Sequence, residues 1–360
     1  MPVKVVFNLV RGLPSGRARG MKLKFVATGL FLRVALGSLR PRHLQSLIPG
    51  TIAGYKQWLA AKKKKLEEAE SRDVARRLGE DIEPVLGTDD EASIAWIGDR
   101  GKASKFVLFL HGGGYVLGAN PGHLELCWRC YVAGEPGDRN EVAVAVVQYT
   151  LCPEASYPDQ LRQVCAALSM LLDRGIAPSN IIFGGDSAGG NLTVQLIRHL
   201  VEPHPGIPPI MLAEPVAGAF MVSPLVDTRT DLRSYVDNDP VDIISAMLCH
   251  NAAREFLRDR PGDMTLDEMH ALALPLEGDS AWMARIDSAV GALYVTGGKQ
   301  EVFADQIGQF AEIVRRQCPG LELRFEMAEH EAHDYILLEG MLGEGFEAME
   351  RMQAWASTVL

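Results

Sequence analysis

A regular alternation of short apolar runs with helix-like segments constrains the fold of this chain more than any other feature. Continuous apolar runs are typical of strands buried on both faces, and strands that alternate with helices predict an α/β fold with a mostly parallel, doubly wound sheet. The apolar runs are 92–98, 105–110, 142–149, 180–183, 218–222, 291–296 and 321–327, and the helix-like segments are 161–175, 191–200, 303–317 and 346–358.

Residues 228–285 interrupt this alternation. They are rich in charged and turn residues and contain one helix candidate, residues 244–259. In an open α/β sheet, ligands bind beyond the carboxyl ends of the strands. We therefore expect the insertion to cover a binding site at that edge.

The charge of the chain is unevenly distributed. Residues 1–65 contain 14 Lys and Arg and no Asp or Glu, although the net charge is −10, so the remainder carries −24. Such an acidic body would be repelled by phosphate, which argues against nucleic acid as a partner. The asymmetry instead suggests that the basic segment contacts the acidic body or an anionic surface.

The apolar part of the basic segment, residues 25–39, is interrupted by Arg33, and its longest uncharged run is eight residues. This is too short for a transmembrane helix, and the pattern of a signal peptide is absent. We expect an intracellular protein that is cytoplasmic or peripheral on a membrane. Three roles stay open for the segment: a cap helix packed on the body, a membrane contact through residues 20–45, or a mobile arm.

The stretch GGDSAGGNL (184–192) lies between an apolar run and a helix-like segment. Gly185 and Gly189 flank Ser187 in the pattern G-x-S-x-G, which fits a sharp strand-to-helix turn that exposes a serine hydroxyl. A side chain at either glycine would collide with the tight turn. The following helix directs its N-terminal N–H groups towards the same place, where they would stabilise a negative charge. A plain strand–helix turn is the alternative interpretation.

The stretch HGGGY (111–115) follows the apolar run 105–110 directly. Consecutive glycines leave the backbone open to a ligand, and their N–H groups can converge on an oxyanion. The N–H of the residue after the serine, Ala188, would complete the hole. A simple glycine-rich turn is the alternative interpretation of this stretch.

A serine is a poor nucleophile until a base takes its proton, and the base acts best when a carboxylate orients it. Glu301 and Asp305 follow the run 291–296, and His330 and His333 follow the last run. The order serine, acid, histidine along the chain is that of the α/β-hydrolases. Either acid and either histidine could complete the set.

The six cysteines do not indicate a disulfide framework in a chain of this length. Cys127 and Cys130 form a C-x-x-C pair, but no second pair of ligands at zinc-binding spacing is evident. We expect buried thiols, and neither a metal nor an organic cofactor.

Five motifs in this order resemble the hormone-sensitive-lipase branch of the α/β-hydrolase fold, which includes carboxylesterases, arylacetamide deacetylase and steryl acetyl hydrolases. The resemblance covers about residues 90–360 and rests on HGGGY, YTLCPEASYP, GDSAGGNL, GGKQEVFAD and HEAHDY.

The resemblance implies a role for each of several residues. It makes Ser187 the nucleophile, Glu301 the acid and His333 the base, with His330 and Asp305 as rivals, and it forms the oxyanion hole from N–H groups of Gly113, Gly114 and Ala188. Tyr115 and Asp186, beside these motifs, are expected to contact substrate. The resemblance also implies a cap built from the N-terminal segment and the late insertion, so we predict an N-terminal cap or basic segment (1–75) and a hydrolase domain (76–360) with a cap insertion (228–285).

The function that follows from the resemblance is a serine carboxylesterase acting through an acyl-enzyme. Its expected substrate is a short-acyl ester, such as an acetyl ester, of a hydrophobic alcohol. One alternative is a lactonase, dehydrating or cyclising enzyme that uses the same residues. Another is a non-catalytic binding protein, like the plant gibberellin receptors, which resemble this family but lack the histidine. A homodimer stays open.

Overall fold

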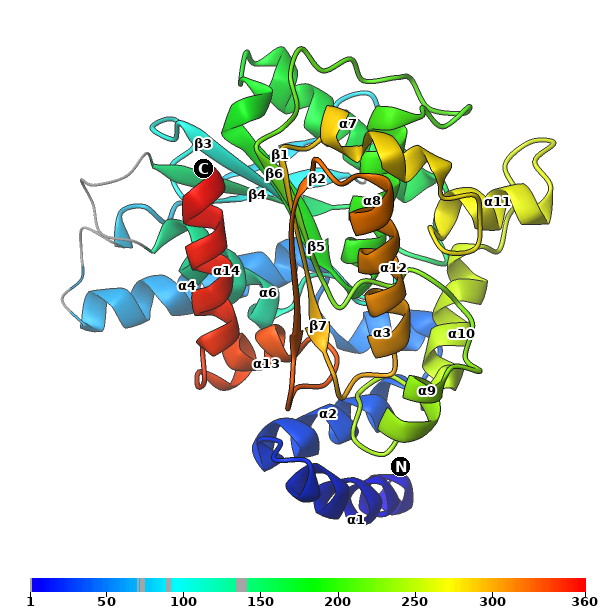
Figure 1. The fold of residues 1–360 in the computed structure, drawn as a ribbon. Coiled ribbons are helices and arrows are strands. Elements are labelled where there is room, and N and C mark those ends of the chain that lie inside the picture. The colour runs from blue at the N-terminus through cyan, green and yellow to red at the C-terminus, as the bar shows by residue number, and fades with distance from the viewer. Residues whose placement is uncertain (1, 70, 72–74, 89–91, 134–140) are drawn as a thin grey trace.

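An eight-stranded sheet forms the centre of the molecule, with the order β1-β2-β4-β3-β5-β6-β7-β8 (Figure 1). The computed structural model describes residues 2–69, 71, 75–88, 92–133 and 141–360. The strands are β1 Ile82–Pro84, β2 Ser93–Ile97, β3 Lys105–Leu110, β4 Val142–Gln148, β5 Ile181–Asp186, β6 Gly218–Val222, β7 Ala292–Gly298 and β8 Glu322–Ala328.

The predicted mostly parallel sheet is confirmed. Strands β3 to β8 pair in parallel, while β2 pairs antiparallel with β4 and β1 antiparallel with β2. The apolar runs predicted all strands except β1, which is three residues long and has no apolar pattern. In the register of β3 and β5, Leu110 pairs with Gly185. The segments that follow these two strands therefore leave the sheet at the same edge.

Helices cover both faces of the sheet (Figure 1). One face packs against α7 Asp159–Asp173, α8 Ser187–Val201 and α12 Ala304–Gln317. The other packs against α4 Thr51–Glu68, α6 Pro121–Cys127, a π-helical turn Trp128–Val132, α13 Tyr335–Leu342 and α14 Glu347–Val359.

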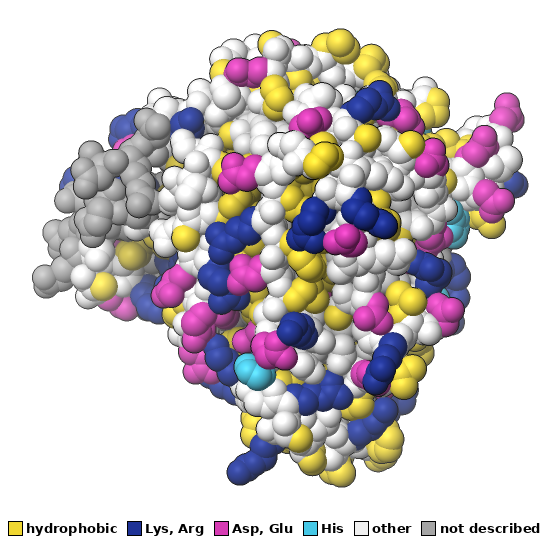
Figure 2. All heavy atoms as spheres, in the orientation of Figure 1, with side chains coloured by type: hydrophobic (Ala, Val, Ile, Leu, Met, Phe, Trp, Pro, Cys, Tyr) yellow, Lys and Arg dark blue, Asp and Glu magenta, His cyan; other side chains and the backbone are white. Residues whose placement is uncertain are grey.

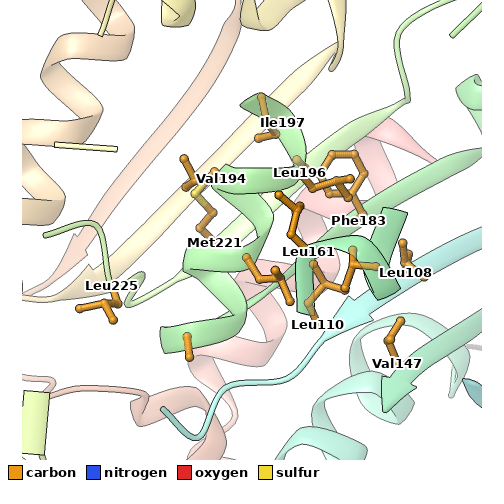
Figure 3. Close-up of a cluster of buried hydrophobic side chains, with 14 of the residues drawn as sticks. Leu108, Leu110, Val147, Leu161, Phe183, Val194, Leu196, Ile197, Met221 and Leu225 are labelled. Carbon is orange, nitrogen blue, oxygen red and sulfur yellow. The ribbon is translucent and has the colours of Figure 1, made fainter. Parts of the chain in front are cut away.

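Successive side chains of a strand enter different cores, because they point to opposite faces of the sheet. In β3, Leu108 and Leu110 join one core, whereas Val107 and Phe109 join the other. Figure 3 shows part of the first core, in which side chains from β3, β4, α7, β5, α8 and β6 gather. Burial of each such Leu or Phe stabilises the fold by about 1.5–3 kcal/mol. This core fixes the strand ends that carry the polar motifs.

Two further groups of helices lie outside this framework. The first comprises α1 Pro2–Ala18, α2 Leu23–Leu36 and α3 Pro41–Leu47, and the second, between β6 and β7, comprises α9 Arg233–Asn238, α10 Ala246–Phe256, α11 Leu266–Ala273 and a 3₁₀ helix Ala281–Ser288. The groups touch each other, since Val26 and Leu30 of α2 form a small apolar cluster with Val241 of the insertion.

None of the helices formed by the described residues has both the length and the apolarity needed to cross a bilayer. The thiols of Cys127 and Cys130, at the junction of α6 and the π-helical turn, are buried, as expected.

Candidate active site

Ser187 occupies the sharp turn between β5 and α8. It is the first residue of α8, directly after the last residue of β5, and its φ is +50°, which is uncommon outside glycine. A Cβ at Gly185 or Gly189 would lie 1.8 Å or 1.9 Å from the carbonyl oxygen of Leu110. Only glycine lets the turn pack this closely against β3, and the serine is held in its strained conformation as a result.

His333 meets Ser187 from the loop that follows β8. Its Nε2 lies 2.9 Å from Ser187 Oγ, although 146 residues separate the two along the chain. Both side chains are buried. A histidine at hydrogen-bond distance from a serine hydroxyl can take the serine proton.

Glu301 follows β7 and lies on the other side of the imidazole. Its Oε2 is 3.7 Å from His333 Nδ1, and it accepts a hydrogen bond of 2.6 Å from Ser223 Oγ. The first distance exceeds a hydrogen bond, and among the described residues His333 Nδ1 has no other partner. Such contacts are often long in ligand-free sites and shorten when substrate binds. Glu301 is thus positioned to orient the base after a small movement.

The loop 111–115 carries two glycines with positive φ, Gly113 at +106° and Gly114 at +62°. Among the described residues, the N–H groups of these glycines have no hydrogen-bond acceptor. The N–H of Ala188, at the second residue of α8, is likewise without an intrahelical acceptor, as at any helix start. These three donors are free to bind an oxyanion.

Asp186 and Tyr115, which the sequence suggested as substrate contacts, bind groups within the protein. Asp186 Oδ1 accepts the Gly112 N–H at 3.1 Å, and its Oδ2 lies 3.0 Å from His123 Nε2. The Tyr115 hydroxyl donates to Asn191 Oδ1 at 2.6 Å, and its ring stacks on Phe256 with centroids 3.8 Å apart. Both side chains are buried and make these contacts within the protein, so they hold the glycine loop in place.

The rival acid and base lie elsewhere. Asp305 is in the first turn of α12 and accepts the Ser234 N–H at 2.9 Å. His330 Nδ1 lies 2.8 Å from the carbonyl oxygen of Arg19, on the surface. Among the described residues, neither forms a hydrogen bond or ion pair with Ser187 or with His333. The geometry favours Glu301 and His333.

Asp242, in the insertion, was not predicted. Its Oδ1 accepts the His333 N–H at 3.1 Å and its Oδ2 accepts the Val302 N–H at 2.6 Å. One buried carboxylate therefore joins the loop of the histidine to the loop of the acid. The sequence carries no signal for this role, because Asp242 lies 91 residues from His333 in a segment without a motif.

Ser223, directly after β6, was also missed. It has a φ of +45°, and its Oγ donates to Glu301 while accepting the Asp334 N–H at 3.2 Å. Ser223 is thus a second link between the loops of the acid and the histidine. A serine just past a strand end was the available signal.

The pKa values of His333 and of the carboxyls around it are raised. Burial raises the pKa of Glu301 to about 8. Burial alone would lower the pKa of His333, but the carboxyls of Asp334, Glu301 and Asp242 outweigh it and raise this pKa to about 10. The nearest of them, Asp334, has its Oδ2 3.2 Å from His333 Nε2.

The N-terminal helix α2 covers this cluster. A small cavity beside His333 is lined by apolar residues of α2 and of the insertion, among them Phe25, Val26, Val241 and Ile243. Arg33 of α2 binds the same stretch of the insertion, with hydrogen bonds to Asp239 Oδ1 at 2.6 Å and to the Asp242 carbonyl at 3.2 Å. The two helical groups thus form one apolar cover over the histidine.

Comparisons with known proteins agree with this geometry. Residues 107–337 match a family described as alpha/beta hydrolase fold. An acetyl-hydrolase of Streptomyces hygroscopicus is 26% identical over 265 residues, which are 73% of this chain and 79% of that protein.

Solved structures show the same fold. A thermostable esterase from Pseudomonas putida has a TM-score of 0.67 at 18% identity and covers 93% of this chain and 95% of its own. An esterase from the bacterial hormone-sensitive lipase family has a TM-score of 0.59 at 23% identity and covers 78% of this chain and 84% of its own.

Proposed function

The chain belongs to the alpha/beta hydrolase fold family, and on that premise we propose that it is a serine carboxylesterase with Ser187 as its nucleophile. The resemblance to the hormone-sensitive-lipase branch is confirmed by the relatives it matches. The single observation that supports the assignment of the nucleophile most strongly is the 2.9 Å contact between Ser187 Oγ and His333 Nε2, made at a strained strand-to-helix turn.

The proposed reaction proceeds in two halves. His333 Nε2 takes the hydroxyl proton as Ser187 Oγ bonds to the ester carbonyl carbon, and the resulting oxyanion is bound by the N–H groups of Gly113, Gly114 and Ala188. Collapse breaks the bond to the alcohol oxygen, which leaves with the proton from His333. Water then repeats the sequence on the acyl-enzyme and releases the acid.

Glu301 is proposed to orient His333 and to stabilise the imidazolium that forms in each half-reaction. Its carboxylate approaches Nδ1, while Nε2 faces the serine. Retention of this histidine in contact with Ser187 supports an enzyme over a binding protein without catalytic activity.

The proposed substrate is a short-acyl ester, such as an acetyl ester, of a hydrophobic alcohol. The name of the Streptomyces relative supports the acyl group. We also propose that residues 1–75 and the insertion 228–285 form the cap that selects the substrate, because α2 packs on the insertion and Asp242 of the insertion binds the loop of His333.

Hydrolysis of p-nitrophenyl esters from acetate to laurate tests the proposal. Wild type should turn over acetate and butyrate fastest, and Ser187→Ala or His333→Ala should lower kcat by a factor of about 10⁴ or more. The matched controls are the rival residues: His330→Ala and Asp305→Asn should retain activity, whereas Glu301→Gln should lose most of it.

Three results would contradict the esterase, the nucleophile or the base. Well-folded wild type without activity on any ester would contradict the esterase. Full activity of Ser187→Ala would contradict the nucleophile, and a larger loss in His330→Ala than in His333→Ala would contradict the base.

A further inference from the structure

The outward face of α1 carries an apolar stripe that nothing in the described chain covers. Val3, Val6, Phe7 and Val10 are each between 60% and 82% exposed. Their spacing of three and four residues places them on one side of the helix. We name these four residues the α1 stripe. An exposed stripe of this kind marks an interaction surface, whereas scattered apolar residues would not.

The opposite face of α1 fixes how the stripe is presented. Leu9 and Leu13 pack against the cluster formed by Met21, Val26, Leu30 and Val241. A Cβ at Gly12 would lie 2.5 Å from the carbonyl oxygen of Pro240, so the helix is seated directly on the insertion. Because α1 is held by this face, the α1 stripe must point away from the body.

Polar contacts hold the helix in the same orientation. Arg11 Nη1 pairs with Asp239 Oδ2 at 2.9 Å, and Arg19, just beyond the helix end, donates to Asn238 Oδ1 and to Gln300 Oε1 at 2.8 Å. The stripe is therefore a fixed surface of the folded protein and not one side of a loose arm.

The charge around the α1 stripe is positive. Helix α1 has no acidic residue, and its neighbours up to residue 65 have none either. Lys4 and Arg17 are exposed and form no ion pair with any described residue. In the orientation of Figure 1, the lower end of the molecule combines hydrophobic side chains with Lys and Arg over α1 and α2 (Figure 2).

We propose that α1 docks this protein on an anionic lipid surface, with the α1 stripe in the apolar layer and Lys4 and Arg17 at the phosphates. An apolar helix face on a helix whose only charged residues are cations is the pattern that binds at such an interface. A second copy of the chain fits less well, because pairing through α1 would bring Lys4 and Arg17 of the two copies together.

The proposal moves the lipid contact away from residues 20–45, where sequence alone suggested it. Within that range α2 buries Phe25, Val26, Leu30 and Val34 against the body. Docking through α1 would bring α2, which lies beside the loop of His333, next to the membrane in which lipophilic esters dissolve.

Vesicle co-sedimentation of the full chain tests the proposal. Wild type should pellet with vesicles of equal parts phosphatidylcholine and phosphatidylglycerol, weakly with phosphatidylcholine alone, and less as salt increases. The variant Val6→Ser/Phe7→Ser/Val10→Ser should lower the partition coefficient about tenfold or more. Its control is Leu86→Ser/Met211→Ser/Leu266→Ser, which alters equally exposed apolar residues outside the basic segment and should pellet like wild type.

A charge variant separates the electrostatic contribution to lipid binding from the apolar one. Lys4→Glu/Arg17→Glu should weaken pelleting with the anionic vesicles, whereas Lys64→Glu/Lys65→Glu, the same change of charge on α4, should have a smaller effect. All variants should hydrolyse soluble esters like wild type, which shows that they fold and keeps this test independent of the catalytic proposal.

Three results would overturn the proposal. The first is wild type that does not pellet, and the second is a stripe variant that pellets like wild type. The third is a dimer in light scattering that the stripe variant abolishes while lipid binding is absent, which would assign the α1 stripe to contact between copies.

Discussion

The Asp242 carboxylate accepts the backbone N–H of His333, with 3.1 Å between Asp242 Oδ1 and His333 N. Its second oxygen accepts the N–H of Val302, the residue after Glu301. Asp242 belongs to the insertion between β6 and β7, yet it sets the spacing between the loops that carry the proposed acid and base. The insertion that covers the site thus also holds the loops of His333 and Glu301 in position.

Asp242→Asn should lower kcat for p-nitrophenyl acetate by about 10- to 100-fold with little change in KM. The asparagine can accept only one of the two N–H groups, and its own NH₂ would face the other, which displaces His333 relative to Ser187. Steady-state kinetics on the purified enzyme measures kcat and KM separately. A change confined to KM would show that Asp242 acts on substrate binding and not on position.

Asp334→Asn should move the acidic limb of the pH profile of kcat/KM to lower pH by about 1 unit or more. Only neutral His333 can take the Ser187 proton, so activity rises as this group loses its proton. The Asp334 carboxylate helps to raise the pKa of His333 to about 10, and its removal lowers that pKa. The measurement is kcat/KM between neutral and strongly alkaline pH.

The matched control for this change is Glu344→Gln, which removes an exposed carboxylate that pairs with Lys24. Its profile should coincide with that of wild type. An unchanged profile in Asp334→Asn would mean that the acidic limb reflects the ionisation of a group other than His333.

Asp186→Ala should lower the free energy of unfolding by about 3–5 kcal/mol, because it leaves buried His123 and the Gly112 N–H unpaired. Burial opposes ionisation of Asp186, but His123 and the Gly112 N–H outweigh it and lower the pKa of Asp186. Burial opposes protonation of His123, but Asp186 outweighs it and raises that pKa. Urea denaturation of both proteins measures the loss.

The sign of the pH dependence follows from these directions. The contribution of Asp186 is complete above the unfolded pKa of 3.8 and disappears as pH falls through the lower folded value. That of His123 is complete below 6.5 and disappears as pH rises through its higher folded value. The stability difference between wild type and Asp186→Ala should therefore be largest between pH 3.8 and pH 6.5. A difference that grows at lower pH would refute the ion pair.

Gly189→Ala should destabilise the protein by about 1–3 kcal/mol or more and abolish esterase activity. The new methyl group would lie 1.9 Å from the Leu110 carbonyl oxygen, and all its near neighbours are backbone atoms that cannot move aside. Gly308→Ala in α12 is the control, since no atom lies within 4 Å of its Cβ position. There the substitution should stabilise by about 0.5–1 kcal/mol.

The strands and the nucleophile turn could be predicted from the sequence because their causes are local. The run KFVLFL is apolar at every position after Lys105 because both faces of β3 are buried. Gly185 and Gly189 are required by one close approach to Leu110. The polar motifs then lie close together because they follow parallel strands, whose carboxyl ends lie at one edge of the sheet.

The supporting contacts could not be predicted because they join segments that are distant along the chain. Nothing near Asp242 indicates that it accepts N–H groups from two loops, and nothing near Asp186 indicates that its partner is His123. Nothing near Tyr115 indicates that its ring stacks on Phe256 of α10.

The bonds from Arg33 to Asp239 and to the Asp242 carbonyl bear on engineering of the cover. A chimera that takes α2 from one relative and residues 239–242 from another would separate this arginine from its acceptors, and Asp242 would no longer be set against the histidine loop. The transplantable module is therefore discontinuous in sequence. It includes α2, the 239–242 turn and the loop around His333, and grafts that carry the three together should keep turnover while exchanging the apolar wall.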